Sequence, residues 1–199
     1  MSAKLISIIG PPGCGKTTLA TNLARVLGGR FIREPFASNP FLADAYGGQA
    51  DARLPAQLYF LLSRAGQLAR TVWPAEGLCV SDYGFCQDRL FAETTLAAEE
   101  LALYEPIRER LAVCIHPPEL LILLDAPEAE LLRRIAARGR EFEKVMTADF
   151  LGDMRARYRR VADAAACSVL RVDNHAVDLR NPAELATLAA DVRRTLELE

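Results

Sequence analysis

The segment spanning residues 10–17 is the part of the chain with the clearest chemical meaning. It reads Gly-Pro-Pro-Gly-Cys-Gly-Lys-Thr, a full match to the pattern G-x-x-x-x-G-K-[ST]. In such a loop the backbone N–H groups point at phosphate oxygens, and the following helix directs its positive end toward them. Lys16 would reach the terminal phosphates of a nucleoside triphosphate, and Thr17 would hold a magnesium ion that bridges them. The residues predicted to bind the nucleotide are Gly10, Pro11, Pro12, Gly13, Cys14, Gly15, Lys16, Thr17 and Thr18.

The segments on either side of this loop support that prediction. An apolar run at residues 5–9 is typical of a buried strand, and residues 16–27 have the pattern of a helix. The alternative is an ordinary glycine-rich turn that happens to contain a lysine. A strand before the loop and a helix after it favour the phosphate-binding interpretation.

Three acidic residues stand at the ends of predicted strands, at the edge of the sheet where the loop also lies. Glu34 precedes a proline and not a helix start, so helix capping does not explain it. We expect Glu34 to act as a general base toward a hydroxyl that attacks the γ-phosphate. Asp82 is the candidate second magnesium ligand, either directly or through water. Asp125 precedes Ala-Pro-Glu and is interpreted as a helix cap.

Polar side chains on a long predicted helix indicate where an acceptor molecule would bind. Gln57 and Arg64 lie seven residues apart, two helical turns, and therefore share one face. A glutamine amide offers both a donor and an acceptor to the edge of a nucleobase. The alternative is that both residues belong to the solvated face of an otherwise apolar helix.

A cluster of arginines late in the chain predicts a lid. Arg134 and Arg138 are one helical turn apart, and Arg140 follows Gly139. Three guanidinium groups around a glycine hinge suit a segment, at about residues 134–146, that closes on a phosphoryl group in transfer. The alternative is a basic helix surface that only contacts water.

The elements that must position these groups alternate along the chain. Strands are predicted at residues 5–9, 30–33, 78–82, 120–125 and 169–172. Helices are predicted at 16–27, 52–72, 87–112 with a break, 127–138, 147–164 and 182–197. This alternation predicts an α/β protein with a five-stranded parallel sheet flanked by helices, in which ligands bind at the carboxyl ends of the strands.

Composition narrows the classes of function. The chain has 199 residues, 51% hydrophobic and 25% charged, and fits one domain over residues 1–199. A net charge of −2 gives no reason to expect nucleic acid as a partner, and no apolar run is long enough to span a membrane. The five cysteines form no C-x-x-C pair, and the N-terminus does not resemble a signal peptide. We therefore expect a cytoplasmic protein with reduced thiols.

Taken together, these segments resemble the deoxynucleoside kinases, from the glycine-rich loop to about residue 160. The likeness rests on several strings in one order and at one spacing, and it is closer to the bacterial purine-directed branch. The strings are the loop itself, Glu34-Pro35-Phe36, Asn39-Pro40-Phe41-Leu42, Gln57-Leu58-Tyr59, Ser63-Arg64, Asp88-Arg89-Leu90-Phe91-Ala92, and Arg134, Arg138-Gly139-Arg140 and Glu143.

The resemblance implies roles for the residues that match the acceptor site of this family. Glu34 matches the base that removes the proton of the sugar 5′-hydroxyl, and Gln57 matches the residue that hydrogen-bonds the nucleobase. Tyr46 and Glu143 match the pair that holds the 3′-hydroxyl. The remaining pair, Arg64 and Asp88, matches the residues that read the outer edge of the base, where an acid favours deoxyadenosine, deoxyguanosine or deoxycytidine over thymidine.

The lid arginines have matches as well. Arg138 matches the residue that stacks on the adenine of ATP, while Arg134 and Arg140 match residues that contact phosphates. One position departs from the family: after Asp82, where an arginine is expected, this chain has Tyr83. We hypothesise that Arg89 or a lid arginine substitutes for it.

The sequence therefore predicts an ATP- and Mg²⁺-dependent 5′-kinase of deoxynucleosides, with purines favoured, in a P-loop kinase fold with an arginine-rich lid. Deoxyadenosine and deoxyguanosine are not distinguished. Two alternatives stay open: a nucleoside monophosphate kinase of the thymidylate kinase type, and a nucleotide-binding module without catalysis. The resemblance also implies a homodimer through the long helices, and the apolar stretch from Leu96 to Leu111, interrupted at Pro106, permits one.

Overall fold

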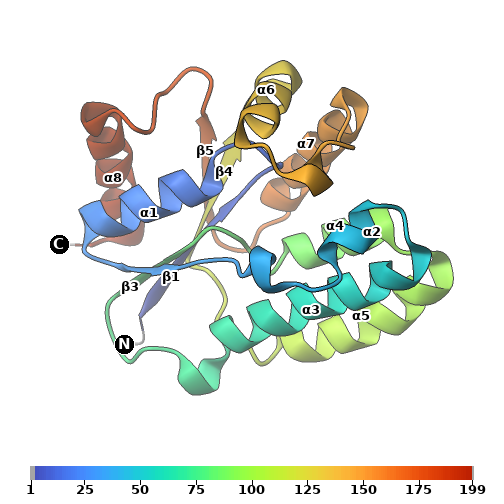
Figure 1. The fold of residues 1–199 in the computed structure, drawn as a ribbon. Coiled ribbons are helices and arrows are strands. Elements are labelled where there is room, and N and C mark those ends of the chain that lie inside the picture. Colours follow the sequence, from blue (N-terminus) through green and yellow to red (C-terminus); the bar gives the residue numbers. More distant parts are fainter. Residues whose placement is uncertain (1–2, 199) are drawn as a thin grey trace.

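The computed structural model describes residues 3–198, which form a five-stranded parallel sheet with helices on both faces (Figure 1). The order across the sheet is β2-β3-β1-β4-β5. Successive connections run first to one side of β1 and then to the other, so a binding crevice is expected outside the carboxyl end of β1. The strands are β1 (Lys4–Ile9), β2 (Arg30–Ile32), β3 (Leu78–Ser81), β4 (Leu120–Asp125) and β5 (Ser168–Asp173).

Local signals explain where several helices begin and end. α8 begins at Pro182, and the side chain of Asn181 accepts a hydrogen bond from the N–H of Ala183 at 3.0 Å. α6 ends where Gly139 takes a left-handed conformation, with φ of 67°. The α-helices are α1 (Lys16–Leu27), α2 (Leu42–Tyr46), α3 (Ala50–Leu68), α4 (Gln87–Thr95), α5 (Ala98–Ala112), α6 (Glu128–Arg138), α7 (Ala148–Asp163) and α8 (Pro182–Leu196). Short 3₁₀ helices occupy Phe36–Ser38, Arg70–Val72 and Glu141–Glu143.

The predicted elements are all present, with three differences. The helix expected at 52–72 ends as an α-helix at Leu68 and is followed by a 3₁₀ turn. The break expected within 87–112 lies at residues 96–97 and not at Pro106, because the N–H of Ala97 is capped by the Glu100 carboxylate at 2.9 Å and a new helix starts there. The five-residue helix α2 was not predicted, since it is too short to show a periodic pattern.

The two faces of the sheet carry separate cores. On one face, α1 and α8 cover side chains of β1, β3 and β4 that include Ile6, Val80 and Ile122. On the other face, α3 and α5 pack near β1 and β3, while α4 and α7 pack over β1 and β4. Within the described residues, no helix has the length and apolar character needed to cross a membrane. The helical layers leave the carboxyl edge of the sheet facing α2 and the α6–α7 connection (Figure 1).

Candidate active site

A cavity of about 690 Å³ opens at the carboxyl edge of the sheet. It is lined by the glycine-rich loop, the ends of β2 and β3, one face of α3 and α4, and the segment after α6. Of the predicted site residues, it brings together Lys16, Thr17, Glu34, Tyr46, Gln57, Arg64, Asp82, Arg134, Arg138, Arg140 and Glu143, besides Pro12, Gly13, Gly15 and Thr18 of the loop. The remaining candidates lie directly behind this wall: Gly10, Pro11 and Cys14 within the loop, and Asp88 beneath Arg64.

The glycine-rich loop has a backbone shape that only glycine allows. Gly13 has φ of 83°, and a Cβ there would lie 2.8 Å from the carbonyl oxygen of Leu131 in α6. The ammonium group of Lys16 lies across the loop, where it donates to the carbonyl oxygens of Gly10 at 2.7 Å and Pro11 at 3.0 Å. The loop is therefore already curled around its lysine, as a phosphate cradle requires.

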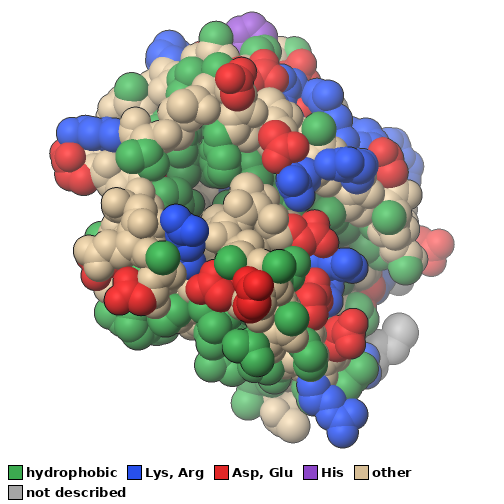
Figure 2. Space-filling view, turned by 90° about the vertical axis from the view of Figure 1, so that its right-hand side faces the viewer, with side chains coloured by type: hydrophobic (Ala, Val, Ile, Leu, Met, Phe, Trp, Pro, Cys, Tyr) green, Lys and Arg blue, Asp and Glu red, His purple; other side chains and the backbone are tan. Residues whose placement is uncertain are grey.

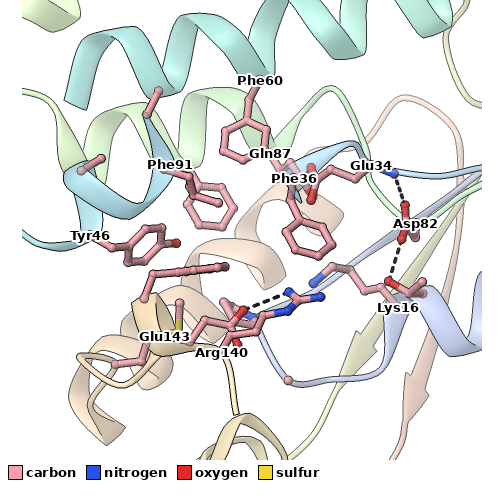
Figure 3. Close-up of a pocket in the computed structure, with 18 of the residues that line it drawn as sticks. Lys16, Glu34, Phe36, Tyr46, Phe60, Asp82, Gln87, Phe91, Arg140 and Glu143 are labelled. Carbon is pink, nitrogen blue, oxygen red and sulfur yellow. Dashed lines mark hydrogen bonds and ion pairs between the residues drawn. The ribbon is translucent and has the colours of Figure 1, made fainter. Parts of the chain in front are cut away.

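Asp82 links the loop to the acid at the end of β2. One of its carboxylate oxygens accepts a hydrogen bond from Thr17 Oγ1 at 2.7 Å, and the other accepts the backbone N–H of Glu34 at 2.7 Å (Figure 3). Burial raises the pKa of Asp82, and the hydrogen bonds from Thr17 and Glu34 oppose that shift. Because β2 and β3 are neighbours in the sheet, their ends place Glu34 and Asp82 side by side.

The carboxylate of Glu34 is held by two side chains. The guanidinium of Arg64 donates to Glu34 Oε1 through Nε at 2.9 Å and also through a terminal nitrogen, and Gln87 Nε2 donates to the same oxygen at 3.1 Å. Arg64 in turn contacts Asp88, which is 0% exposed. The general-base candidate is thus anchored by residues from α3 and α4.

Aromatic rings form the middle of the cavity. Phe36, Phe60 and Phe91 line it, and Figure 3 shows the rings of Phe36 and Phe91 between Tyr46 and Glu34 in that view. Gln57 is buried on the same wall, and its Oε1 has no hydrogen-bond partner among residues 3–198. Flat apolar walls with an unsatisfied amide oxygen suit a planar ligand that carries a polar edge.

The segment after α6 contributes a carboxylate that holds two arginines. Glu143 accepts from Arg138 Nε at 3.0 Å and from Arg140 Nη1 at 3.1 Å, and the Arg140 guanidinium lies 3.7 Å from the centre of the Phe36 ring. The ring of Tyr46 packs 5.5 Å from that of Phe142. Burial, with a smaller effect of Glu143, raises the pKa of the Tyr46 hydroxyl to about 12.

Arg134 lies between this cavity and a second one. It donates to Glu130 at 2.6 Å and to the carbonyl oxygen of Asn174 at 2.7 Å. The side chain of Asn174 donates to the carbonyl oxygen of Cys14 at 2.6 Å, so the segment after β5 supports the loop. The second cavity, of about 520 Å³, lies between α6 and that segment and meets the first cavity at Gly15.

The structure corrects two sequence interpretations. Arg89 does not take the place of the arginine expected at position 83, because its exposed side chain pairs with Glu93 at 2.8 Å and Glu105 at 3.1 Å. Asp125 does not cap α6, whose N-cap residue is Pro127. Instead its carboxylate binds Arg155 at 2.8 Å, because the end of β4 packs beside α7.

Some residues of the cavity carried no sequence signal. Gln87 and Asn174 belong to no motif, and only the fold brings Gln87 against Glu34 and Asn174, which lines the second cavity, against the loop. Phe60 lines the first cavity from between Gln57 and Arg64 on α3. A helical projection of residues 50–68 would have put Phe60 near the face of Gln57 and Arg64, which is the one signal that the sequence held.

A phosphate-binding loop after the first strand of a parallel sheet, with a carboxylate and arginines facing it, defines a P-loop kinase. The chain belongs to the deoxynucleoside kinase family, whose model ("Deoxynucleoside kinase") matches residues 6–195. It is 31% identical over 204 residues to deoxyguanosine kinase of Bacillus subtilis (strain 168), covering 98% of this chain and 99% of that protein. It is 29% identical over 186 residues to deoxyadenosine/deoxycytidine kinase of the same organism, covering 89% of this chain and 85% of that protein.

Solved structures agree on the fold. The structure of M. mycoides deoxyadenosine kinase with bound dCTP has a TM-score of 0.80 at 18% identity, and the match covers 96% of this chain and 99% of that one. The predicted α/β P-loop kinase fold with a five-stranded parallel sheet is therefore confirmed. Family membership makes the protein a kinase that transfers a phosphoryl group to a deoxynucleoside.

Proposed function

We propose that this kinase uses ATP and Mg²⁺ to phosphorylate the 5′-hydroxyl of purine deoxynucleosides. The observation that carries the proposal is the chain of contacts from Thr17 through the Asp82 carboxylate to the backbone N–H of Glu34, with both acids on the cavity that the phosphate loop lines. The relative named deoxyguanosine kinase supports the choice of purines, while the other is named for one purine and one pyrimidine, deoxyadenosine and deoxycytidine. The aromatic part of the cavity, with the buried amides of Gln57 and Gln87 beside it, fits a neutral nucleoside.

The chemistry follows from these positions. Glu34 takes the proton of the 5′-hydroxyl, whose oxygen forms a bond to the γ-phosphorus while the bond from that phosphorus to the β–γ bridging oxygen breaks, leaving ADP. Lys16, Arg134 of α6 and Arg140 after α6 neutralise charge that spreads over the transferred group. Positioning and electrostatics therefore supply most of the rate enhancement.

The residues beside the loop fit a magnesium ion. Thr17 Oγ1 and an Asp82 oxygen lie 2.7 Å apart beside the phosphate loop. That arrangement suits Mg²⁺, which uses one or two protein ligands and takes the others from phosphates and water. When bound, the ion would neutralise phosphate charge.

We assign the second cavity to the nucleoside part of ATP. Its junction with the first cavity at Gly15 and Thr18 lets one molecule place its phosphates on the loop and its base between α6 and the segment after β5. Arg134 reaches both cavities. Arg138, the predicted partner of the adenine, would have to leave Glu143 in order to stack on it.

A panel of acceptors tests this function. We expect ATP-dependent phosphorylation of deoxyguanosine or deoxyadenosine, and loss of transfer when Mg²⁺ is removed. The matching 2′,3′-dideoxynucleoside should react more weakly, because Tyr46 and Glu143 are proposed to hold the 3′-hydroxyl. Chromatography of the products is the measurement. Transfer only to monophosphates would show a nucleoside monophosphate kinase, and ATP binding without transfer would show a binding module.

We also propose a homodimer in the cytoplasm. Leu62 of α3 and Leu103 and Ile107 of α5 expose apolar side chains, and Leu103 is 65% exposed. Figure 2, in which the right-hand side of Figure 1 faces the viewer, shows hydrophobic side chains gathered over the lower part of that side.

All five cysteines are free thiols, which suits a reducing compartment such as the cytoplasm. Cell fractionation would test this location.

For the dimer, we expect Leu103→Glu combined with Ile107→Glu to convert a species of twice 21.9 kDa into a monomer. Charges on an apolar interface must be desolvated, so they oppose association. Sedimentation velocity at about 10 µM is the measurement, a concentration well above the Kd of a typical stable dimer. Val72→Glu, which alters an exposed apolar residue in the 3₁₀ turn after α3, is the matched control. A monomeric parent protein would refute the proposal.

A further inference from the structure

The carboxylate of Glu34 is held through only one of its two oxygens. The described residues give it three hydrogen bonds, two from the Arg64 guanidinium and one from Gln87 Nε2, and all three go to Oε1. The side chain is 19% exposed and lines the first cavity, so Oε2 is left for a ligand. A carboxylate that must take a proton needs one oxygen that is aimed at the substrate and bound by no other donor.

The amide of Gln87 lies between Glu34 and the helix α7. Gln87 is the first residue of α4 and is 2% exposed. Its Nε2 lies 3.1 Å from Glu34 Oε1, and its Oε1 lies 3.3 Å from the hydroxyl oxygen of Tyr158. A charged carboxylate can only accept hydrogen bonds, so the amide must direct its NH₂ group toward Glu34. The amide oxygen then faces Tyr158, whose hydroxyl must donate.

Tyr158 supplies a fixed hydroxyl behind this amide. It lies in α7, is 1% exposed, and belongs to one core cluster with Ile9 of β1 and Leu123 of β4. Burial raises the pKa of its hydroxyl well above the usual range, so the group keeps its proton and can donate. If the Gln87 amide turned over, its oxygen would face a carboxylate and its NH₂ group would face a donor, so both contacts would be lost. The hydroxyl therefore fixes the orientation of the amide.

Gln87 and Arg64 hold the Glu34 carboxylate from different directions. Arg64 approaches from α3 and also contacts Asp88, whereas Gln87 approaches from the start of α4 and is held by α7. The last torsion of a glutamate side chain has a broad energy minimum, so one partner alone would let the carboxylate rotate. Two partners on separate helices restrict that rotation. Together Glu34, Arg64, Gln87 and Tyr158 form a largely buried cluster.

We propose that Gln87 is a positioning residue for the general base: its amide, oriented by the hydroxyl of Tyr158, holds Glu34 Oε1 so that Oε2 points at the 5′-hydroxyl of the deoxynucleoside. The proposal rests on the proposed function, in which Glu34 takes that proton. Alignment of a catalytic group affects the chemical step, so losing it should lower kcat and leave KM nearly unchanged. A residue that bound the nucleoside itself would change KM.

Steady-state kinetics with the purine deoxynucleoside that reacts best is the first test. Gln87→Met keeps the length of the side chain and removes both polar ends. We expect it to lower kcat about tenfold, the loss of one hydrogen bond to a charged group, with KM within about twofold of the wild type. Tyr158→Phe lets the amide turn and should lower kcat about threefold. Gln49→Met and Tyr59→Phe, the same changes outside both cavities, are the controls and should match the wild type.

A double-mutant cycle separates positioning from a structural or binding role. Gln87→Met and Tyr158→Phe are each combined with Glu34→Gln, in which residue 34 can no longer take the proton. If Gln87 acts through Glu34, each second change should alter the single-turnover rate less than about twofold. A tenfold loss from Gln87→Met in that background would overturn the inference, because Gln87 would then act without Glu34. An unchanged kcat for Gln87→Met with Glu34 in place would also overturn it.

Failure of the proposed function would look different. A wild type that phosphorylates no deoxynucleoside, or a Glu34→Gln variant with wild-type kcat, would refute the function itself. Circular dichroism shows whether Gln87→Met folds. If it does not, the same cycle with Tyr158→Phe decides, and a kcat equal to that of the wild type in this variant would overturn the inference.

Discussion

Glu34→Gln is expected to lower kcat about 10³-fold, within the range for loss of a general base, with a smaller change in KM for the nucleoside. The amide keeps the shape of the side chain, and its oxygen can still accept from Arg64 and Gln87. What it loses is the ability to take the 5′-hydroxyl proton. The effect should therefore fall on the chemical step and not on binding.

Single-turnover kinetics with the purine deoxynucleoside identified in the acceptor panel would measure that step directly. Glu99→Gln, the same change at an exposed position of α5, is the matched control and should match the wild type. Equal melting temperatures for the variant and the wild type would show that the buried cluster survives. A variant that keeps more than about a tenth of the wild-type kcat would mean that Glu34 is not the base, since general bases contribute 10²-fold or more.

Lys16→Met is expected to lower kcat about 10³-fold and also to weaken ATP binding. Lys16 Nζ now lies within hydrogen-bond distance of two loop carbonyl oxygens, those of Gly10 and Pro11. From that position it reaches phosphates on the inner side of the loop, where its charge acts in a site shielded from water. Methionine fills a similar volume and supplies no charge.

The measurement combines steady-state kinetics with ATP titration by calorimetry. The matched control is Lys4→Met, at the start of β1 and so at the opposite end of the strand from the loop, where Lys4 Nζ contacts the carbonyl oxygen of Leu196. Intact ATP affinity together with intact kcat in Lys16→Met would contradict the assignment of residues 10–17 as the phosphate site.

The fold was largely predictable because its three central parallel strands, β1, β3 and β4, are buried on both faces. Residues 120–125 are Leu-Leu-Ile-Leu-Leu-Asp, and such continuous apolar runs between helical patterns have few other interpretations. Features that depend on local chain geometry were less visible. The helical segment is interrupted at Ala97, where a capping contact from Glu100 marks the start of α5. Pro106 lies inside α5 and does not interrupt it.

The candidate site was predictable where a motif or a strand end identified a residue. Glu34, Asp82 and Lys16 were placed in the cavity from the sequence, and the structure puts them there. Contacts between distant segments were beyond reach, since no pattern says that Arg64 of α3 touches both Glu34 and Asp88. Arg89 or a lid arginine was expected to substitute for the arginine that position 83 lacks. The arginine that contacts Glu34 is instead Arg64, in α3.

The contacts of the Glu143 carboxylate bear on how fast ATP would be hydrolysed when no acceptor is bound. In this structure it holds Arg138, the predicted partner of the adenine, and Arg140, one of the cations proposed to neutralise the transferred phosphoryl group. If the sugar 3′-hydroxyl competes for the same carboxylate, both arginines are released toward ATP only when an acceptor is in place. ATP alone would then meet a site whose cations are occupied, and its wasteful hydrolysis by water would be slow.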